Sequence, residues 1–433
     1  MTTATDAEPA APAALSPGYV RYALWILLVV YILNFLDRQI VTILAEPIRR
    51  ELGLSDTQLG LLGGLAFALF YTVLGIPIAR YADNPRTNRV GVIAAALAIW
   101  SGMTALCGMA ATYAHLLLAR IGVGVGEAGC TPPAHSLIAD YVPKEKRASA
   151  VAFYGLGIPI GSLMGLVIGG WLNDQFGWRM AFFLVGVPGL LLALVVLLTL
   201  REPRKMRAAL SQTRAPEAAP LGEALREIAQ SKAFLLMAIA ASFVAFLGYG
   251  KAFWAAALFQ RVHGLSSTET GLWLGLVTGA AGIAGVWLGG YVGDRFAKRD
   301  PRHYLTAPAI GMAVTAPILT MGYLSTDWML ALALLFVPTI ANNLYYGPVF
   351  ACVQGLVSPR TRATAAAVML FIINLIGLGL GPLVFGMISD LLRPQFGIDS
   401  IRYVLVGAAV MGVAPAYFFW RASLHLGREL KPG

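Results

Sequence analysis

Twelve apolar runs, each long enough to cross the hydrocarbon core of a bilayer, alternate with short polar loops along the 433 residues of the chain. Continuous runs of this length indicate helices, because a helix satisfies its backbone hydrogen bonds within the segment. The sequence therefore predicts an all-helical, multi-pass membrane protein. The expected helices are residues 20–43, 58–81, 90–111, 115–139, 148–172, 180–200, 233–260, 270–293, 303–324, 328–355, 362–388 and 401–420.

The basic residues give the chain a net charge of +10. They lie mainly in the loops between the apolar runs, where Lys and Arg set orientation in the membrane, so we expect no nucleic-acid partner. With both termini cytoplasmic, most of these residues are also cytoplasmic, which predicts this orientation in the plasma (inner) membrane. The basic residues of the outer loops are then Arg49, Arg50, Arg179, Arg261, Arg393 and Arg402.

A polar stretch at residues 201–232 separates the runs into two groups of six. It contains three prolines and several basic residues, so we interpret it as a linker with a surface helix near residues 221–229. The first residues lack the positive segment of a secretory signal. We expect a disordered cytoplasmic tail at 1–18, an N-terminal six-helix bundle at 19–200, a cytoplasmic linker at 201–232, a C-terminal six-helix bundle at 233–420 and a cytoplasmic tail at 421–433.

Two short motifs occur once in each half of the chain. Residues 77–83, PIARYAD, and residues 289–299, GGYVGDRFAKR, both end a predicted helix. Residues 142–150, VPKEKRASA, and residues 357–365, VSPRTRATA, both precede one. Two parallel repeats joined by a linker are a plan found among secondary transporters.

These motifs carry a resemblance to a known family. Residues 290–299 resemble the loop signature of the major facilitator superfamily, although the first copy has Ala79 and Asn84 at positions that the signature gives to Gly and a basic residue. Several stretches of the first half resemble the Spinster family: NFLDR at 34–38, GVGEA at 124–128, LIAD at 137–140 and IPIGS at 158–162.

The resemblance implies twelve transmembrane helices in two pseudo-symmetric six-helix bundles. It further implies secondary active transport by alternating access. Known animal members of the Spinster family export sphingosine phosphate or lysophospholipids, so the resemblance implies an amphipathic, lipid-like substrate. We expect the protein to work as a monomer surrounded by membrane lipid.

Two charged residues lie inside the predicted helix at 115–139. Arg120 and Glu127 are two helical turns apart and share a face, which Thr131 and His135 continue. A charge at the bilayer centre costs about 2.5–3.5 kcal/mol on insertion scales, so such residues mark functional cavities. The alternative interpretation is a structural ion pair that locks two helices together.

Asp37 and Arg38 lie on the first predicted helix, with Asn34 near the face of Asp37. We expect Arg38 or Arg120 to neutralise Glu127, unless Arg38 extends toward the membrane interface instead. Glu127 is our first candidate for proton coupling and Asp37 is the second, because a carboxylate changes charge when it binds a proton.

Few charged side chains lie in the helices of the second half, and Lys251 is the exception. The residues expected to bind a substrate head group are Lys251, Tyr249, Asn342, Asn343 and Asn374. For each asparagine the alternative is an interhelical hydrogen bond, and for His135 it is a hydrogen-bonded structural role rather than a proton relay.

Two acidic residues end helices on the predicted cytoplasmic side and are expected to form a gate. Each is followed by basic residues, and opening the gate must break the contacts that these carboxylates make between the halves. The first group is Asp83, Arg86 and Arg89, and the second is Asp294, Arg295 and Arg299.

Sequence signatures of common enzymes and nucleotide sites are missing. The chain contains no GxxxxGK[ST], HExxH or GxSxG motif, and its three cysteines lack metal-ligand spacing, so we expect no enzyme activity, cofactor or metal. We expect proton-coupled transport of an amphipathic, anionic substrate. The alternatives are transport of a small organic anion or drug, an uncoupled lipid scramblase or receptor, and an intramembrane enzyme that uses Asp37 and Glu127.

One helix carries a regular series of glycines. Gly157, Gly161, Gly165 and Gly169 recur every four residues and line one face. This pattern predicts close packing of a neighbouring helix against that face.

Overall fold

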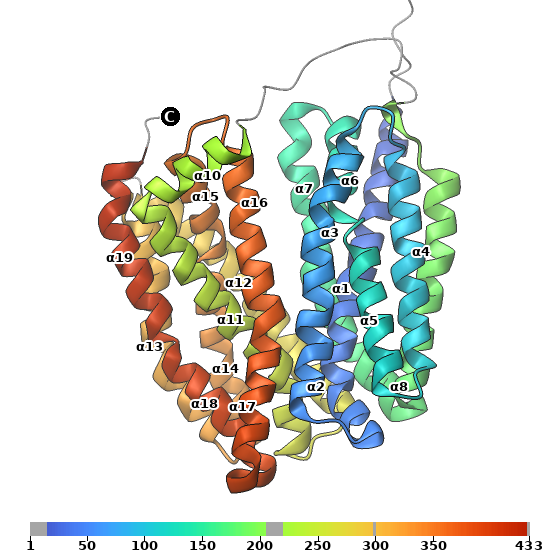
Figure 1. The fold of residues 1–433 in the computed structure, drawn as a ribbon, viewed down its shortest axis with the longest axis vertical. Helices are drawn as coiled ribbons and strands as arrows, with labels where there is room; N and C mark the ends of the chain where they lie inside the picture. The colour runs from blue at the N-terminus through green and yellow to red at the C-terminus, as the bar shows by residue number, and fades with distance from the viewer. Residues whose placement is uncertain (1–14, 205–219, 298–299, 431–433) are drawn as a thin grey trace, which may run out of the picture.

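The computed structural model describes residues 15–204, 220–297 and 300–430, and in these ranges it contains helices and no β-strand. Its two halves stand side by side, with their helices running between the same two ends of the molecule (Figure 1). The first half comprises α1 (Pro17–Leu52), α2 (Asp56–Gly60), η1 (Leu61–Leu65), α3 (Ala66–Asp83), α4 (Arg89–Gly108), α5 (Tyr113–Glu127), α6 (Thr131–Tyr141), η2 (Lys144–Lys146), α7 (Arg147–Gly155) and α8 (Gly157–Thr199).

The second half begins with a short helix, α10, which is followed by the remaining long helices. Its elements are α10 (Leu221–Gln230), α11 (Lys232–Arg261), α12 (Ser267–Ala297), α13 (His303–Leu324), α14 (Trp328–Asn343), α15 (Tyr346–Leu356), α16 (Arg362–Ile372), η3 (Ile373–Leu380), α17 (Gly381–Phe396), η4 (Gly397–Asp399), α18 (Ser400–Met411) and α19 (Val413–Glu429). We call the end of the molecule at which α1 begins the Pro17 end, and the end at which α1 stops the Leu52 end.

Nine helical segments of the described residues are long and apolar enough to cross a membrane. Two of them, 149–199 and 362–429, have 51 and 68 residues and therefore cross twice. The chain turns within the first of these at Gly177, whose φ of 81° lies in the left-handed region. With the interrupted segment at 113–141, this confirms the expected twelve crossings.

The helix predicted at 115–139 is interrupted, and the expectation of a continuous helix is wrong. α5 ends at Glu127 and α6 begins at Thr131. Pro132 and Pro133 follow the break and have no backbone N–H to donate to the preceding turn. The segment at 328–355 is interrupted between α14 and α15 just before Pro348, so the corresponding helices of the two halves break at similar places.

α1 is longer than the expected 20–43 and continues to Leu52. Arg49 and Arg50, which we placed in an outer loop, lie on its last turn and form ion pairs with Glu46 at distances of 2.8 and 3.1 Å. Pairs three and four residues apart support a helix, and Gly53, with φ of 64°, then ends it.

The glycine face of α8 packs against α1, as the glycine series predicted. A Cβ atom at Gly161 would lie 2.4 Å from the carbonyl oxygen of Ile32, and one at Gly165 would lie 2.7 Å from that of Leu36. Real Cβ atoms do not approach so closely, so glycine is required for this contact. The packing fixes the middle of α1, where Asp37 and Arg38 lie.

The helix expected near residues 221–229 is α10, and it is attached to the second half. Ala224 and Ile228 are buried, and the Glu227 carboxylate accepts hydrogen bonds from the Ser358 backbone N–H and the Thr361 hydroxyl at 2.8 and 2.6 Å. These contacts hold α10 beside the beginning of α16.

Candidate functional site

Arg38 and Glu127 form an ion pair in the interior of the first half. The Arg38 Nε donates to Glu127 Oε2 at 2.7 Å, and Glu127 is fully buried while the Arg38 side chain is 15% exposed. Arg38 therefore pairs within the bundle and does not extend to the interface. The break between α5 and α6 directly after Glu127 places this carboxylate at a helix end opposite the middle of α1.

Aromatic rings surround the Arg38 guanidinium. Its Cζ atom lies 4.9 Å from the ring centroid of Phe35, 5.1 Å from that of Phe67 and 4.5 Å from that of Tyr71. A cation over an aromatic face is stabilised by about 0.5–2 kcal/mol. Phe67 and Tyr71 were not among the predicted site residues, because an aromatic residue in an apolar helix has no sequence signal that separates packing from cation binding.

Arg120 lies deeper than Arg38 and is 2% exposed. Its Nε and Nη1 atoms have no hydrogen-bond partner among the residues that the structure describes, and its Cζ lies 5.3 Å from the Phe67 centroid. Asp37 is 2% exposed and accepts a hydrogen bond from the Thr104 hydroxyl of α4. Arg38 is therefore the arginine that both pairs with Glu127 and retains exposed surface.

The other predicted residues of the first half differ in burial and in contacts. Asn34 is fully buried one turn before Arg38. Thr131 is the half-buried first residue of α6. His135 is exposed, and its ring packs in a T-shaped arrangement with the Tyr154 ring at a centroid distance of 5.4 Å.

The structure separates the predicted residues of the second half. Tyr249 is 39% exposed and lies close enough to Arg38 and Tyr71 to interact with them electrostatically. Lys251 instead lines a cavity of about 20 Å³ within the second half, together with Asn342. This volume suits about one water molecule.

The remaining two asparagines lie on different elements. The Asn343 side chain donates to the Thr339 carbonyl oxygen of its own helix at 2.8 Å. Asn374 is half-buried in the π-helical turn η3. Among these predicted second-half residues, Tyr249 is thus the one with a described electrostatic interaction with the charged pair.

A second charged cluster joins the two halves at the Leu52 end. Arg261 of α11 donates to both carboxylate oxygens of Asp56 at 2.8 Å and to Glu46 at 2.8 and 3.1 Å. Asp390 of α17 accepts from the Thr57 backbone N–H and hydroxyl at 2.8 and 2.7 Å. We expected Arg261 in an outer loop. Its partners lie more than 200 positions away in the chain, so no local pattern could reveal this pairing.

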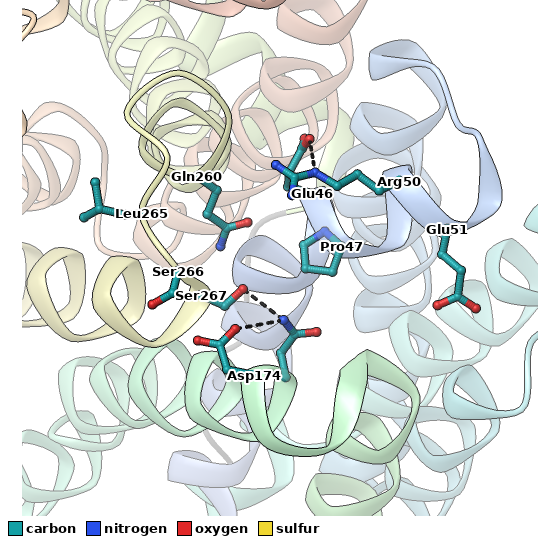
Figure 2. A pocket seen from close by; sticks show the side chains of 10 residues that line it. Glu46, Pro47, Arg50, Glu51, Asp174, Gln260, Leu265, Ser266 and Ser267 are labelled. Atoms are coloured by element: carbon teal, nitrogen blue, oxygen red, sulfur yellow. Dashed lines mark hydrogen bonds and ion pairs between the residues drawn. The ribbon is translucent and has the colours of Figure 1, made fainter.

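A cavity of about 450 Å³ lies between the halves beside this cluster. Figure 2 shows Glu46, Gln260 and Asp174 approaching it from three elements. Asp174 accepts a hydrogen bond from the Thr268 backbone N–H at 2.7 Å, and Gln260 donates to the Ile43 carbonyl at 3.0 Å. The polar groups around the cavity therefore also join the halves.

The predicted gate residues that the structure describes lie at the Pro17 end. Arg89 is fully buried and pairs with Glu202 and with Asp140, the latter at 2.7 Å, so it binds the segment after α8 to the end of α6. Arg86 is exposed, and the exposed Arg295 donates to the Tyr291 hydroxyl at 3.5 Å. The side chains of Asp83 and Asp294, and all of Arg299, lie outside the described part of the chain, so the gate stays a prediction.

Comparison with known proteins assigns the architecture to a family. The profile of the Major Facilitator Superfamily matches residues 27–382. The chain belongs to the major facilitator superfamily. Members of this superfamily with solved structures and the curated relatives are transporters, so the chain is a transporter of the facilitator fold and not an enzyme.

Individual relatives place the chain within the superfamily. It is 34% identical over 409 residues to an MFS-type efflux pump of Mycolicibacterium smegmatis, with 94% of each chain covered. It is 28% identical over 438 residues to protein spinster homolog 1 of Homo sapiens, covering 92% of this chain and 81% of that protein.

A solved structure agrees with this placement. The crystal structure of a bacterial homologue of the human lysosomal transporter Spinster, inward-facing and unoccupied, matches with a TM-score of 0.86 and 34% identity. The match covers 96% of this chain and all of the other. The facilitator is therefore of the Spinster type, as its motifs implied.

Proposed function

We propose that this facilitator moves an amphipathic, anionic, lipid-like molecule across the membrane and is driven by a proton gradient. The observation that carries the proposal is the buried Arg38–Glu127 ion pair, in which the cation keeps part of its surface exposed while the carboxylate has none. A carboxylate in this position controls, through its own charge, whether the arginine is available to another anion.

The proposed cycle depends on exchange of the partner of Arg38. When Glu127 is ionised, it holds the guanidinium at 2.7 Å. When Glu127 binds a proton, the ion pair is lost and Arg38 can bind the anionic group of the substrate. Ionisation of Glu127 then recovers the arginine and releases the substrate. Proton and substrate favour each other in this scheme, which suits symport, whereas antiport requires them to compete for one site.

The surroundings of Arg38 support an amphipathic substrate. Phe35, Phe67 and Tyr71 provide ring faces within about 5 Å of its guanidinium, and Tyr249 approaches from the second half. The charged group of a lipid would pair with Arg38 while its chain contacts apolar side chains. The name of one relative, an efflux pump, favours export, and an inward proton gradient drives export only where proton and substrate compete for one site.

We also propose an orientation of the protein in the membrane. The Pro17 end faces the cytoplasm of a plasma (inner) membrane, in agreement with the distribution of basic residues. The Leu52 end is then outside, and the Arg261 cluster closes the outer side of an inward-facing monomer. Asp37 is the second proton-binding candidate, because it shares the interior of the first half with Glu127 and Arg120.

Proteoliposomes test the proposal. Transport of a fluorescent lysophospholipid is measured across a range of pH with and without an imposed pH gradient, for wild type, Glu127→Gln and Glu145→Gln. Glu145 is an exposed carboxylate at the Pro17 end and provides the matched control. We expect gradient-driven accumulation in wild type and in Glu145→Gln, and a loss of at least tenfold in Glu127→Gln.

Other outcomes distinguish the alternatives. If Glu127→Gln keeps the wild-type pH profile, Glu127 is not the coupling residue and Asp37→Asn is tested next. Equilibration of the lysophospholipid that ignores the gradient indicates a scramblase. Failure of lysophospholipids to bind, together with self-competition by a small organic acid, indicates a small-anion transporter.

A further inference from the structure

We propose that Thr104 is a positioning residue that transmits the protonation of Asp37 to the end of α5, where Glu127 lies. This inference rests on the proposed proton coupling and adds a residue to it. Thr104 is on α4, is fully buried, and donates its hydroxyl to Asp37 Oδ2 of α1. Thr104 thus joins the helix that carries one candidate proton site to a third helix.

This hydrogen bond differs from those of other helical threonines in the protein. Thr278, Thr315 and Thr339 donate to the carbonyl oxygen four residues earlier in their own helices, at 2.6–2.9 Å. That intrahelical bond is the usual alternative for a buried threonine hydroxyl. Thr104 instead donates across to another helix, so the Asp37 carboxylate replaces the Trp100 carbonyl as its acceptor.

Protonation of Asp37 changes what Thr104 can bind. The ionised carboxylate only accepts hydrogen bonds, whereas the protonated acid also carries an O–H donor. A proton placed on Oδ2 removes the need for the Thr104 hydroxyl as donor there, and the hydroxyl can return to the Trp100 carbonyl. The hydroxyl therefore has two acceptors, and the charge of Asp37 selects between them.

The turn from Trp100 to Thr104 also touches α5. A Cβ atom at Gly126 would lie 2.6 Å from the Trp100 backbone nitrogen, so the two backbones are in direct contact. Gly126 immediately precedes Glu127. A shift of the Trp100 turn on α4 is therefore passed to the residue that holds Arg38.

Among the described residues, the charged and titratable groups around Asp37 do not take the positioning role that we propose for Thr104. Arg38 of the same helix is bound to Glu127, Arg120 of α5 has two unpartnered guanidinium nitrogens, and Cys107 of α4 is a buried thiol. Glu127 of α5 is itself an acceptor. Thr104 is the group whose hydrogen bond to the Asp37 carboxylate is seen among the described residues.

The test compares Thr104→Val with Thr104→Ser in the same lysophospholipid transport assay. Valine keeps the shape and loses the hydroxyl, while serine keeps the donor. A hydrogen bond to a charged acceptor favours the ionised form, so its loss makes proton binding easier. We expect the pH midpoint of transport to rise by about one unit in Thr104→Val, which corresponds to about 1.4 kcal/mol, and to stay at the wild-type value in Thr104→Ser.

A second measurement separates positioning from packing. In an Asp37→Asn background, Thr104→Val should produce no further shift, because the charge that selects the acceptor is gone. If Thr104→Val does not fold, Thr104→Ala is compared with Thr104→Ser in its place. A wild-type midpoint in the variant without the hydroxyl overturns the inference while the proposed coupling stands, and a wild type that ignores pH overturns both.

Discussion

Arg261, at the end of α11, and Asp56, at the start of α2, are joined by two hydrogen bonds of 2.8 Å that link the second half of the protein to the first. Both side chains are buried, with 4% and 0% exposed. Arg261 also binds Glu46, so one cation holds two carboxylates of the first half. The Leu52 end is therefore closed by charges that must separate before it can open.

Loss of the Arg261 cation should open the Leu52 end. Arg261→Gln leaves Glu46 and Asp56 buried without their shared partner, and removal of one partner from a buried pair costs about 3–5 kcal/mol. Spin labels at Ala111→Cys and Gln395→Cys, both at exposed positions of that end, report the separation of the halves. We expect a longer distance population to appear.

Arg50→Gln is the control for this experiment. Arg50 also pairs with Glu46, but its side chain is 62% exposed, and an exposed pair contributes only about 0–1 kcal/mol. Its distance distribution should match that of wild type. An unchanged distribution in Arg261→Gln as well would show that other contacts keep this end closed.

Loss of the predicted gate at the Pro17 end should instead open the Pro17 end. If Asp294 closes that end by contacts between the halves, Asp294→Asn weakens the outward-open state, and cysteines at the Pro17 end become more reactive toward a membrane-impermeant reagent. Asp83→Asn should act in the same direction. Unchanged reactivity in both variants removes the gate role.

Stability should depend on pH through Glu202, which lies just beyond the span that ends at Thr199. Burial by itself raises the pKa of Glu202, but the hydrogen bonds and charge of Arg89 outweigh burial and hold this pKa below its usual value of 4.5. A lowered pKa stabilises the folded state above the unfolded value, and this stabilisation is lost as pH falls through the folded value. Thermal unfolding in detergent should therefore show Tm falling below about pH 4.5.

Glu202→Gln tests the source of that slope. Above pH 5 the variant should be less stable by up to about 3 kcal/mol, because Arg89 loses a buried partner and keeps Asp140. Its Tm should fall less steeply in acid than that of wild type, whereas Glu145→Gln should retain the wild-type slope. Equal slopes in all three proteins would assign the acid sensitivity elsewhere.

The contact of α1 with α8 should not tolerate a methyl group at Gly161. Gly161→Ala forces a backbone shift against Ile32 and should cost about 1–3 kcal/mol. Gly155→Ala, where the added Cβ meets nothing within 4 Å, is the matched control and should be neutral or slightly stabilising. Thermal unfolding of both variants in one detergent gives the comparison.

Local pattern was enough to predict the crossings and the helix face that packs closely. Apolar length determines which segments can span a bilayer, and glycines four residues apart define a face whatever their neighbour is. The boundaries were less accurate where local chemistry competes with apolarity. Glu46 with Arg49 and Arg50 lengthens α1, and Pro132 and Pro133 interrupt the segment that contains Glu127.

The sequence by itself determined the class of the protein, its two repeated halves and the set of charged residues inside the membrane. Apolar runs, repeated motifs and a charged residue within an apolar run can all be recognised from the order of residues alone. Tertiary structure alone decided the partners. It joined Arg38 rather than Arg120 to Glu127. It directed Lys251 into a small cavity lined by second-half residues, and it made Arg261 a contact between the halves. These choices depend on distances between helices that are remote in the chain, and no local periodicity encodes such distances.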